Sequence, residues 1–521
     1  MGERKRREEK SGRAGALVHE GAANRRTVAT LGGRLQVAWD ETSAATPHGQ
    51  LVFFAEFLAA AGVFDAWEKA CPLVYTSSNA PSKRDVLGTV LLGVLAGNTR
   101  YAHITGIRGD AVAAQALGIK QVMSADSVRR ALMQLTSELS ATWLRPHLLR
   151  SVLPVLTTPW ILDIDATVKP LYGHQEGATK SYNPHKPGRP SHVLHTYWVG
   201  NVRQVLDVQL QAGNQHTSAH MRTGLGQILD ELSPQTSPAL VRGDCGYGNE
   251  PVILECEARS QPYLFRLRQT VNVQRLIERV MRRRGWSAAT EMSQGFESID
   301  DDLLLSGWTR SRRVIVMRRR MRHDIAITQP QADGATQLVL ALPTANAEFC
   351  DNTKLWEYTV LVTNTAYELA TIGQLYRDRC DCENGFDELK NQWGWGGFTT
   401  HDMARNQTMA RCVALIYNWW SWYVRAANPT ARLEAVTSRP LLLAAVGRLV
   451  HHAGQALLYL TPMHASLAAI RSMNDNVFAM VGRVRAAAQQ CPLFDRWAAM
   501  LRDIVEQMRL AAALKIRAMG S

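Results

Sequence analysis

Apolar residues divide the chain into a helical first part, a β-containing middle and a helical last part. From residue 51 to about 151 they recur at intervals of three and four, the spacing of amphipathic helices. The spacing then becomes the alternation of strands in five segments: TTPWILDIDATV, SHVLHTYWVG, RQVLDVQL, PALVRGD and PYLFRLR. From residue 403 onward the helical spacing returns.

The order of these elements predicts an α/β protein. Three strands connected as a meander are followed by a helix, a strand, a second helix and a fifth strand. This order is expected of an RNase H-like fold. A β-rich block from 269 to 366 comes next, and we interpret it as an insertion into that core.

Basic residues outnumber acidic ones along the chain. The 521 residues include 59 Lys and Arg against 46 Asp and Glu, a net charge of +13, which favours a polyanionic partner such as nucleic acid. The polar, basic stretch 1–48 is typical of a flexible arm, which either contacts DNA or only aids solubility. Arginines also gather in the 269–366 block, before and within its strands.

Part of the helical first region resembles a helix-turn-helix. A short helix at 111–117 is stopped by Gly118, and Ser124 is a good N-cap for a second helix that carries Arg129 and Arg130. We expect these two arginines to contact DNA. Many helical bundles have the same pattern, so ordinary packing is the alternative.

The cysteines and the apolar runs indicate the cellular compartment in which we expect the protein. Eight cysteines are scattered without the C-x2-C spacing of a zinc site, so we expect free thiols in a reducing cytoplasm. No apolar run is long enough to span a membrane, and the charged start MGERKRREEK does not look like a secretory signal. We therefore expect a cytoplasmic protein that has no membrane partner.

The stretch YRDRCDCENGFDELKNQWGWGGF concentrates the chemically informative residues. Taken as one continuous helix, it places Tyr376, Arg379, Glu383 and Lys390 at about 0°, 300°, 340° and 320° around the axis. A phenol, a guanidinium, a carboxylate and an ammonium would then share one face. The carboxylate could bind a metal and the cations could bind phosphate, whereas a solvated amphipathic face is the alternative.

This Y-x2-R-x3-E-x6-K spacing resembles the signature of DDE transposases of bacterial insertion sequences, in the branch named after insertion sequence four. The resemblance covers residues 160–398 and is weaker beyond. It implies an RNase H-like catalytic domain formed by 156–268 and 367–400. On this interpretation the remaining regions are a basic flexible arm at 1–48, a helical DNA-binding domain at 49–155, a basic β-rich insertion at 269–366 and a helical C-terminal region at 401–521, a possible dimerisation region.

Three carboxylates fit the metal-dependent phosphodiester chemistry of such enzymes. Asp165 and Asp244 are each expected at the end of a strand, and Glu383 on the helix face. Asp163, two residues before Asp165 on the same strand face, is the competitor for the first position; the resemblance favours Asp165 because Thr167 follows it. Asp387 shares the face of Glu383 but does not fit the four-residue spacing. We expect the three residues to bind two Mg²⁺ ions, which Mn²⁺ can replace.

Further residues are expected to contact DNA. The resemblance implies that Tyr376, Arg379 and Lys390 bind phosphates at the ends of the element. Lys186 and Arg189 lie in an exposed basic loop, which we expect to contact the DNA backbone. In this branch a tryptophan of the insertion can stack on a base that leaves the duplex during hairpin formation; the candidates here are Trp286, Trp308 and Trp356.

The sequence thus predicts a bacterial, nucleoid-associated transposase that cuts double-stranded DNA at the terminal inverted repeats of its element and joins the freed 3′ ends to target DNA. Joining two ends implies a homodimer. Two alternatives remain: an RNase H-like nuclease without strand transfer, and a transposase-derived regulator that binds ends without cutting. Alanine at position 166, where the family often has a hydroxyl residue, leaves the regulator open.

Overall fold

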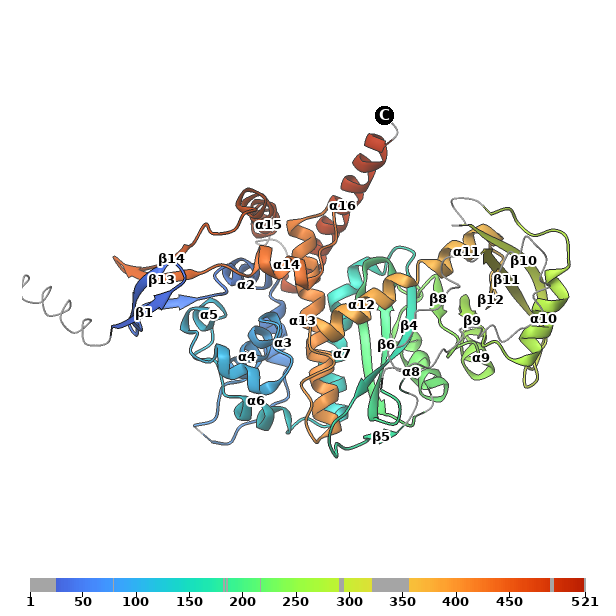
Figure 1. Ribbon diagram of the computed structural model, residues 1–521, viewed down its shortest axis with the longest axis horizontal. Helices are drawn as coiled ribbons and strands as arrows, with labels where there is room; N and C mark the ends of the chain where they lie inside the picture. The colour runs from blue at the N-terminus through green and yellow to red at the C-terminus, as the bar shows by residue number, and fades with distance from the viewer. Residues whose placement is uncertain are drawn as a thin grey trace, which may run out of the picture.

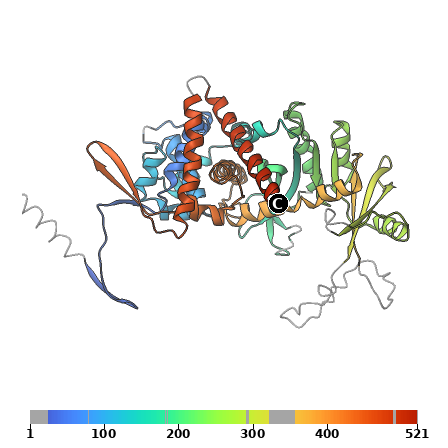
Figure 2. The ribbon, with the colours of Figure 1, turned by 90° about the horizontal axis from the view of Figure 1, so that it is seen from above.

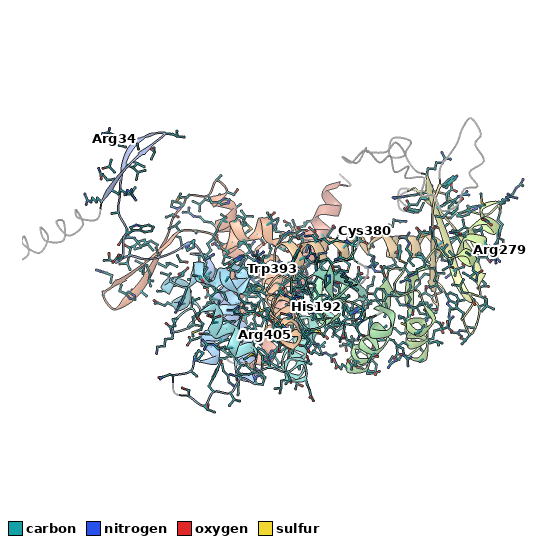
Figure 3. The ribbon with its side chains drawn as sticks, turned by 60° about the horizontal axis from the view of Figure 1, so that its bottom comes forward. Arg34, His192, Arg279, Cys380, Trp393 and Arg405 are labelled. Carbon is teal, nitrogen blue, oxygen red and sulfur yellow. The ribbon has the colours of Figure 1, made fainter. Side chains whose placement is uncertain are left out.

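The protein is elongated, with a helical body at one end, a large sheet in the middle and the outer strands of that sheet at the other end (Figure 1). Arg34 and Arg279 mark the two extremes, and Arg405 lies between them (Figure 3). The computed structural model describes residues 25–77, 79–180, 183, 186–215, 217–289, 295–320, 356–487 and 492–519.

A nine-stranded sheet forms the centre of the molecule. Three of its strands form an antiparallel meander, and two more run parallel to the first strand of that meander on its other side. These strands are β4 (Ile161–Pro170), β6 (Pro190–Val199), β7 (Gln204–Ala212), β8 (Leu240–Gly243) and β9 (Tyr263–Arg266), with the short β5 (Thr179–Lys180) beside β6. The mixed sheet with its helices confirms the predicted α/β class.

The outer strands belong to the block that the sequence suggested was an insertion. They are β10 (Phe296–Leu303), β11 (Arg312–Arg320) and β12 (Trp356–Thr363). β12 pairs antiparallel with β9, so these strands continue the central sheet instead of forming one of their own. Backbone hydrogen bonds therefore run without a break from β9 into the strands of the 269–366 block, and the division of the chain at 269 and 366 stays a prediction.

Helices cover the sheet and connect its strands. α9 begins at the N-cap Asn249, whose side chain accepts the N–H of Val252 at 3.4 Å. α12 crosses one face of the sheet, over β4 and β6 (Figure 1). The helices of this part are α8 (Thr217–Glu231), α9 (Glu250–Ala258), α10 (Val271–Met281), α11 (Leu369–Arg377) and α12 (Cys380–Asn391).

The first part of the chain is a cluster of short helices with regular caps. Ser82, Asp110, Ser124 and Thr136 each accept a backbone N–H from the first turn of the helix that follows. The elements are α2 (Leu51–Ala61), α3 (Val63–Ala70), α4 (Lys83–Leu95), η1 (Tyr101–Ile107), α5 (Ala111–Ala116), α6 (Ala125–Leu132), α7 (Ser137–Val152) and η2 (Leu153–Val155).

One long helix, α13 (Met403–Ala427), joins the helical body to the sheet. It packs on α7 and on β7, and most of its residues are buried, including Trp419, Trp420 and Trp422. Burial on most sides explains the apolar run from Cys412 to Tyr417, and buried polar residues of the helix have partners, as when Arg411 pairs with Asp207. The chain then continues through α14 (Ala435–Leu442), the strands β13 (Gly447–His452) and β14 (Gln455–Leu460), and the helices α15 (Leu467–Ala487) and α16 (Leu493–Met519).

Two flanking regions differ from expectation. Within 1–48, the described part holds an exposed hairpin of β1 (Arg26–Thr30) and β2 (Gly33–Val37), and β3 (Ala44–Thr46) pairs with β13. Within 401–521, the hairpin of β13 and β14 interrupts the helices. Both hairpins lie at the end of the molecule opposite β10–β12 (Figure 2). The basic run at the start of the arm lies outside the described residues.

None of the described helices is both long enough and apolar enough to cross a membrane.

A buried ion pair joins the central strands. Asp163 of β4 and Arg242 of β8 are register partners, and the guanidinium binds the carboxylate through two hydrogen bonds of 2.5 and 2.6 Å. Their side chains are only 1% and 3% exposed. Arg242 also donates to the carbonyl of Leu375 in α11. The pair therefore ties two strands and a helix together.

Replacing Asp163 with asparagine is expected to lower the free energy of unfolding by about 3–5 kcal/mol, because Arg242 would keep a buried charge without its counter-charge. A urea unfolding curve would then shift to lower urea concentration. Asp302→Asn, an exposed carboxylate on the edge strand β10, is the control and should leave the curve in place. Coincident curves for wild type and Asp163→Asn would contradict this role.

Candidate active site

Strand register brings the two predicted aspartates together. Ile164 of β4 is the parallel partner of Gly243 of β8, so the next residues, Asp165 and Asp244, lie at neighbouring positions on adjacent strands. Asp244 directly follows β8, as expected, and its Oδ1 accepts the N–H of Gly246 at 2.8 Å. Asp165 was expected at a strand end; this is wrong, because β4 continues to Pro170 by pairing with β6.

The helix that was expected to carry the signature is in fact two helices. α11 ends at Arg377 and α12 begins at Cys380, so a single helix from Tyr376 is wrong. The backbone at the break keeps right-handed helical angles, with φ −65° and ψ −21° at Arg379. The helical direction is therefore preserved, and Tyr376, Arg379 and Glu383 still line one pocket.

A glycine sets the distance between α12 and the sheet. A Cβ at Gly385 would lie 2.8 Å from the ring of Trp198 in β6, so only glycine permits this close approach. The neighbouring Phe386 meets the same Trp198 ring edge-to-face, with centroids 5.5 Å apart. This contact holds the helix close enough for its side chains to reach β4.

Arg379 is the centre of the charged site. Its Nη2 donates to Asp165 Oδ2 at 2.5 Å, and its Nη1 donates to Glu383 Oε1 at 3.3 Å. The Arg379 side chain is 6% exposed and that of Asp165 is 14% exposed, whereas Glu383 is largely open to solvent. One guanidinium therefore connects the first and third predicted catalytic carboxylates.

Burial and crowding of negative charge perturb this site. Burial raises the pKa of Asp165 to about 7; Arg379 opposes that rise, while the nearby Asp244 and Glu383 add to it. Burial lowers the pKa of Arg379, but Asp165 and Asp244 outweigh it and the net shift is upward. The pKa of Tyr376 is also raised, chiefly by burial. A buried carboxylate beside other carboxylates needs a cation, and here Arg379 provides it.

Alternate residues of β4 point to the same side and have separate partners. Thr167 accepts a hydrogen bond from Lys390 Nζ at 3.1 Å, so Lys390 reaches the strand two residues beyond Asp165. Lys169, which the sequence did not single out, is buried and donates to the carbonyl of Gly397 at 2.5 Å. Burial lowers the pKa of Lys169 to about 7. Only the side-chain alternation of β4 could have indicated it.

The competitor carboxylates occupy other environments. The carboxylate of Asp163 is already bound to Arg242 in a buried ion pair. Asp387 is exposed on α12 and accepts a hydrogen bond from Asn391 Nδ2 at 2.7 Å, one turn away on the same helix. These contacts favour Asp165 and Glu383 over their respective competitors.

The donor set suits a divalent cation. Asp165, Asp244 and Glu383 offer only carboxylate oxygens, which Mg²⁺ prefers, and a guanidinium already occupies the position where positive charge is needed. Among the described side chains, no three acidic, histidine or cysteine residues converge tightly enough to hold a metal ion. Glu383 contacts Arg379 instead of the aspartates. The donor chemistry of the three residues therefore fits the metal, and Arg379 is the group that must move before all three can share it.

The pocket beside this site has a volume of about 490 Å³ and extends to the outer strands. Arg266, Arg319 and Arg377 line it together with Tyr376 and Phe296. The guanidiniums of Arg319 and Arg377 each lie 5.3 Å from the centroid of the Phe296 ring. The sheet edge formed by β10–β12 therefore adds basic and aromatic groups to the candidate site.

The three tryptophan candidates are half-buried and each lies under an arginine. Arg318 covers both Trp286 and Trp356, at 3.9 and 4.4 Å from the ring centroids, and Arg312 lies 4.9 Å from Trp308. None of the three lines the pocket. Their geometry does not choose one of them as a base-stacking residue.

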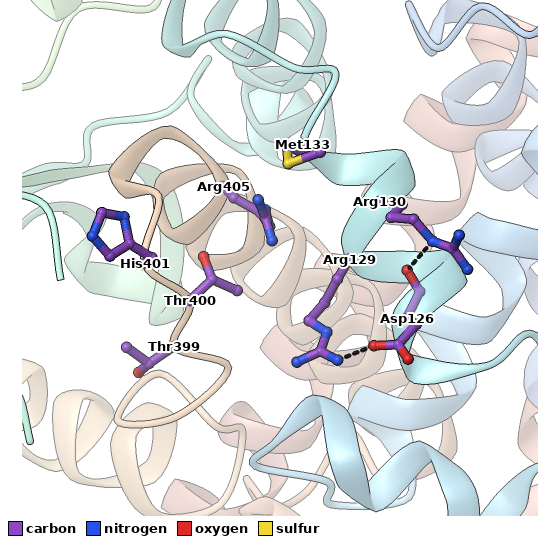
Figure 4. A pocket seen from close by; sticks show the side chains of 8 residues that line it. All are labelled: Asp126, Arg129, Arg130, Met133, Thr399, Thr400, His401 and Arg405. Carbon is purple, nitrogen blue, oxygen red and sulfur yellow. Dashed lines mark hydrogen bonds and ion pairs between the residues drawn. The ribbon is translucent and has the colours of Figure 1, made fainter. Parts of the chain in front are cut away.

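The other predicted DNA-binding residues lie elsewhere. Lys186 and Arg189 lie 4.9 and 4.8 Å from the centroid of Tyr172, an exposed ring. Arg129 and Arg130 of α6 line a different pocket, next to the start of α13. They contact Asp126, one through its carboxylate and the other through its carbonyl (Figure 4).

Fold and site together define an α/β protein that gathers carboxylates and cations where two adjacent parallel strands meet a crossing helix. A family model described as transposase DDE domain, group 1, matches residues 41–481. The chain therefore belongs to this family of DDE transposases, as the resemblance implied.

Comparison with curated proteins finds no match. Among solved structures, the chain is similar to the piggyBac transposase in its synaptic complex with hairpin DNA. The two share 12% identity, the match covers 89% of this chain and 86% of the other, and the TM-score is 0.33. A similarity at that level carries no argument about the present site.

Replacing Arg379 with glutamine is expected to raise the affinity for Mn²⁺ by roughly tenfold in the absence of DNA, because the guanidinium then no longer competes for Asp165. Titration followed by the EPR signal of free Mn²⁺ measures this directly. Arg377→Gln, which removes a charge from the same pocket without touching Asp165, should change the affinity less than twofold. Equal affinity of wild type and Arg379→Gln would contradict competition.

Proposed function

We propose that this protein is a DNA transposase of the insertion-sequence-four-like branch, with an RNase H-like core and Asp165, Asp244 and Glu383 as its catalytic carboxylates. The observation that carries the proposal is that Arg379 bridges Asp165 of β4 and Glu383 of α12, next to the end of β8 where Asp244 lies. Membership of the DDE transposase family supports the reaction class.

The three carboxylates would hold two Mg²⁺ ions, which Mn²⁺ can replace. Bound there, the ions would activate the attacking oxygen and stabilise the leaving oxygen of an in-line phosphodiester displacement. Water is the attacking group in the first nick, and a DNA 3′ hydroxyl is the attacking group in strand transfer.

The chain's own cations would position the DNA. Arg379, once it leaves Asp165, has a forked guanidinium suited to two phosphate oxygens. Lys390 would act as a point charge beside Thr167, and the phenol of Tyr376 faces the same pocket as Arg379. These groups orient the scissile phosphate against the carboxylates, and orientation supplies much of the rate in such a reaction.

The proposed substrate is double-stranded DNA, both as terminal inverted repeats and as target. Lys186 and Arg189 present two exposed cations around Tyr172, a surface suited to a DNA backbone. Arg129 and Arg130 would contribute from the helical region. Because two ends must be joined to one target, we propose that a homodimer acts on paired ends.

Two other functions remain in competition. An RNase H-like nuclease would cut at the same carboxylates without joining products. A regulator derived from a transposase would bind the ends without cutting, and its site would need no metal. The tight Arg379–Asp165 pair is compatible with the regulator as well as with a resting enzyme.

The test uses a DNA duplex with the inverted repeats that flank the gene. Wild type with Mg²⁺ is expected to nick at the repeat boundary and to join the freed 3′ end to a target plasmid. Glu383→Gln should lower the nicking rate by more than about 100-fold, because it removes a proposed metal ligand. Even residues that only hydrogen-bond to metal ligands contribute about 10–100-fold to metal affinity or activity. Sequencing gels read both products.

Asp387→Asn is the matched control, since it removes a carboxylate from the same helix, and it should cut at the wild-type rate. Removing the metal with EDTA should stop both nicking and joining. Nicks without joined product would favour the nuclease. Binding without any cut in Mg²⁺ or Mn²⁺ would overturn the enzyme and favour the regulator.

A further inference from the structure

A second basic pocket lies on the helical side of the molecule, between α6 and the segment that leads into α13 (Figure 4). Its volume is about 470 Å³, and it is open to solvent. Arginines from both sides line it, together with two threonines and a histidine: Arg129, Arg130, Thr399, Thr400, His401 and Arg405.

The pocket keeps a net positive charge even after the ion pair within its lining is subtracted. Asp126 is the acidic side chain of the lining, and it pairs with Arg129. Arg405 keeps its charge available: its backbone N–H is bound by Asp402, but its buried side-chain Nε has no hydrogen-bond partner among the described residues. The Arg405 guanidinium extends into the space between Thr400 and Arg129 (Figure 4). Among the described residues no carboxylate forms an ion pair with Arg405, so its guanidinium can bind an anion in this pocket.

The floor of the pocket is rigid. The backbone and side chain of Thr400 both donate to Asn406 Oδ1, at 2.7 and 3.0 Å, and Asn406 Nδ2 returns a bond to the Thr400 carbonyl at 3.0 Å. The carbonyl of His401 accepts the N–H of Glu176 at 2.9 Å. These bonds fix the positions of Thr399, Thr400 and His401 before any ligand arrives.

The same segment is fixed to the catalytic strand. Lys169 of β4 donates to the carbonyl of Gly397, two residues before Thr399. Gly397 itself is pressed against Thr99, where a Cβ would lie 1.8 Å from the carbonyl oxygen, and the N–H of Phe398 binds that oxygen at 2.7 Å. From Asp165 to Lys169 the strand advances by roughly 13 Å. The segment that forms the floor of the pocket is thus attached to β4 at Lys169, four residues along the strand from Asp165.

We propose that this pocket binds backbone phosphates of the duplex at the element end, a contact that spans the helical region and the segment after α12. The inference rests on the proposed function. Guanidinium, hydroxyl and imidazole groups are the side chains that bind DNA phosphates, and an open, polar, rigid pocket suits a phosphodiester chain that passes through it. The contact sets how far along the duplex the cut falls, because the floor of the pocket and Asp165 are connected through β4.

The experiment measures binding of the terminal duplex, in Ca²⁺, to wild type and to Arg405→Ala. Methylphosphonate linkages, which remove one negative charge, are placed one at a time along the repeat. In wild type, one or two adjacent linkages are expected to weaken binding roughly tenfold. In Arg405→Ala that penalty should disappear at those linkages alone, and the slope of log affinity against log salt should fall by about 1.

Two control variants separate the possible outcomes. Alanine is a good helix former, so α13 should persist, and Arg405→Lys should restore most of the salt slope. Lys69→Ala removes an exposed charge from α3 and should leave the linkage profile unchanged. The same profile of linkage effects in wild type and Arg405→Ala would overturn the inference. So would an Arg405→Ala variant that binds the terminal duplex as wild type does and loses only its binding of target DNA. Absence of binding and cutting by wild type would instead overturn the proposed function.

Discussion

Asp165 is a largely buried carboxylate in the middle of a strand, and its negative charge needs a nearby positive charge to compensate it. Parallel pairing of β4 with β8 adds Asp244 at the neighbouring position, which increases the demand for positive charge. The demand is met by Arg379, which can reach β4 because Gly385 lets α12 lie against Trp198. Strand register, helix approach and the break between α11 and α12 therefore serve one electrostatic requirement.

The other charged side chains of β4 also each have a partner. Asp163 is neutralised by Arg242 through a closed, buried pair, and Lys169 is bound to a carbonyl. Asp165 differs because its partner Arg379, the N-cap of α12, lines an open pocket and also contacts the exposed Glu383. Two aspartates separated by one residue thus have different roles, since one is sealed in the core and the other can exchange its cation.

Much of this could be predicted from the sequence, for identifiable reasons. Alternation located β4, β6, β7, β8 and β9, and the four-residue spacing located Tyr376, Arg379, Glu383 and Lys390. The pairing of the strands could not be predicted, because no local sequence pattern shows that β12 pairs with β9 or that β4 continues past Asp165. The two-residue break before Cys380 was missed because its backbone angles remain helical. Arg405 and Lys169 were missed because their roles depend on contacts between distant segments.

In the proposed enzyme, Arg379 holds the place of a divalent cation at Asp165. The most direct measurement is a crystal structure with Mn²⁺ and a pre-cut duplex end, using anomalous scattering to locate manganese. We expect an anomalous peak about 2.0–2.2 Å from carboxylate oxygens of Asp165 and Asp244, with Arg379 moved onto a phosphate. Manganese bound elsewhere, with Arg379 still paired to Asp165 in the DNA complex, would contradict it.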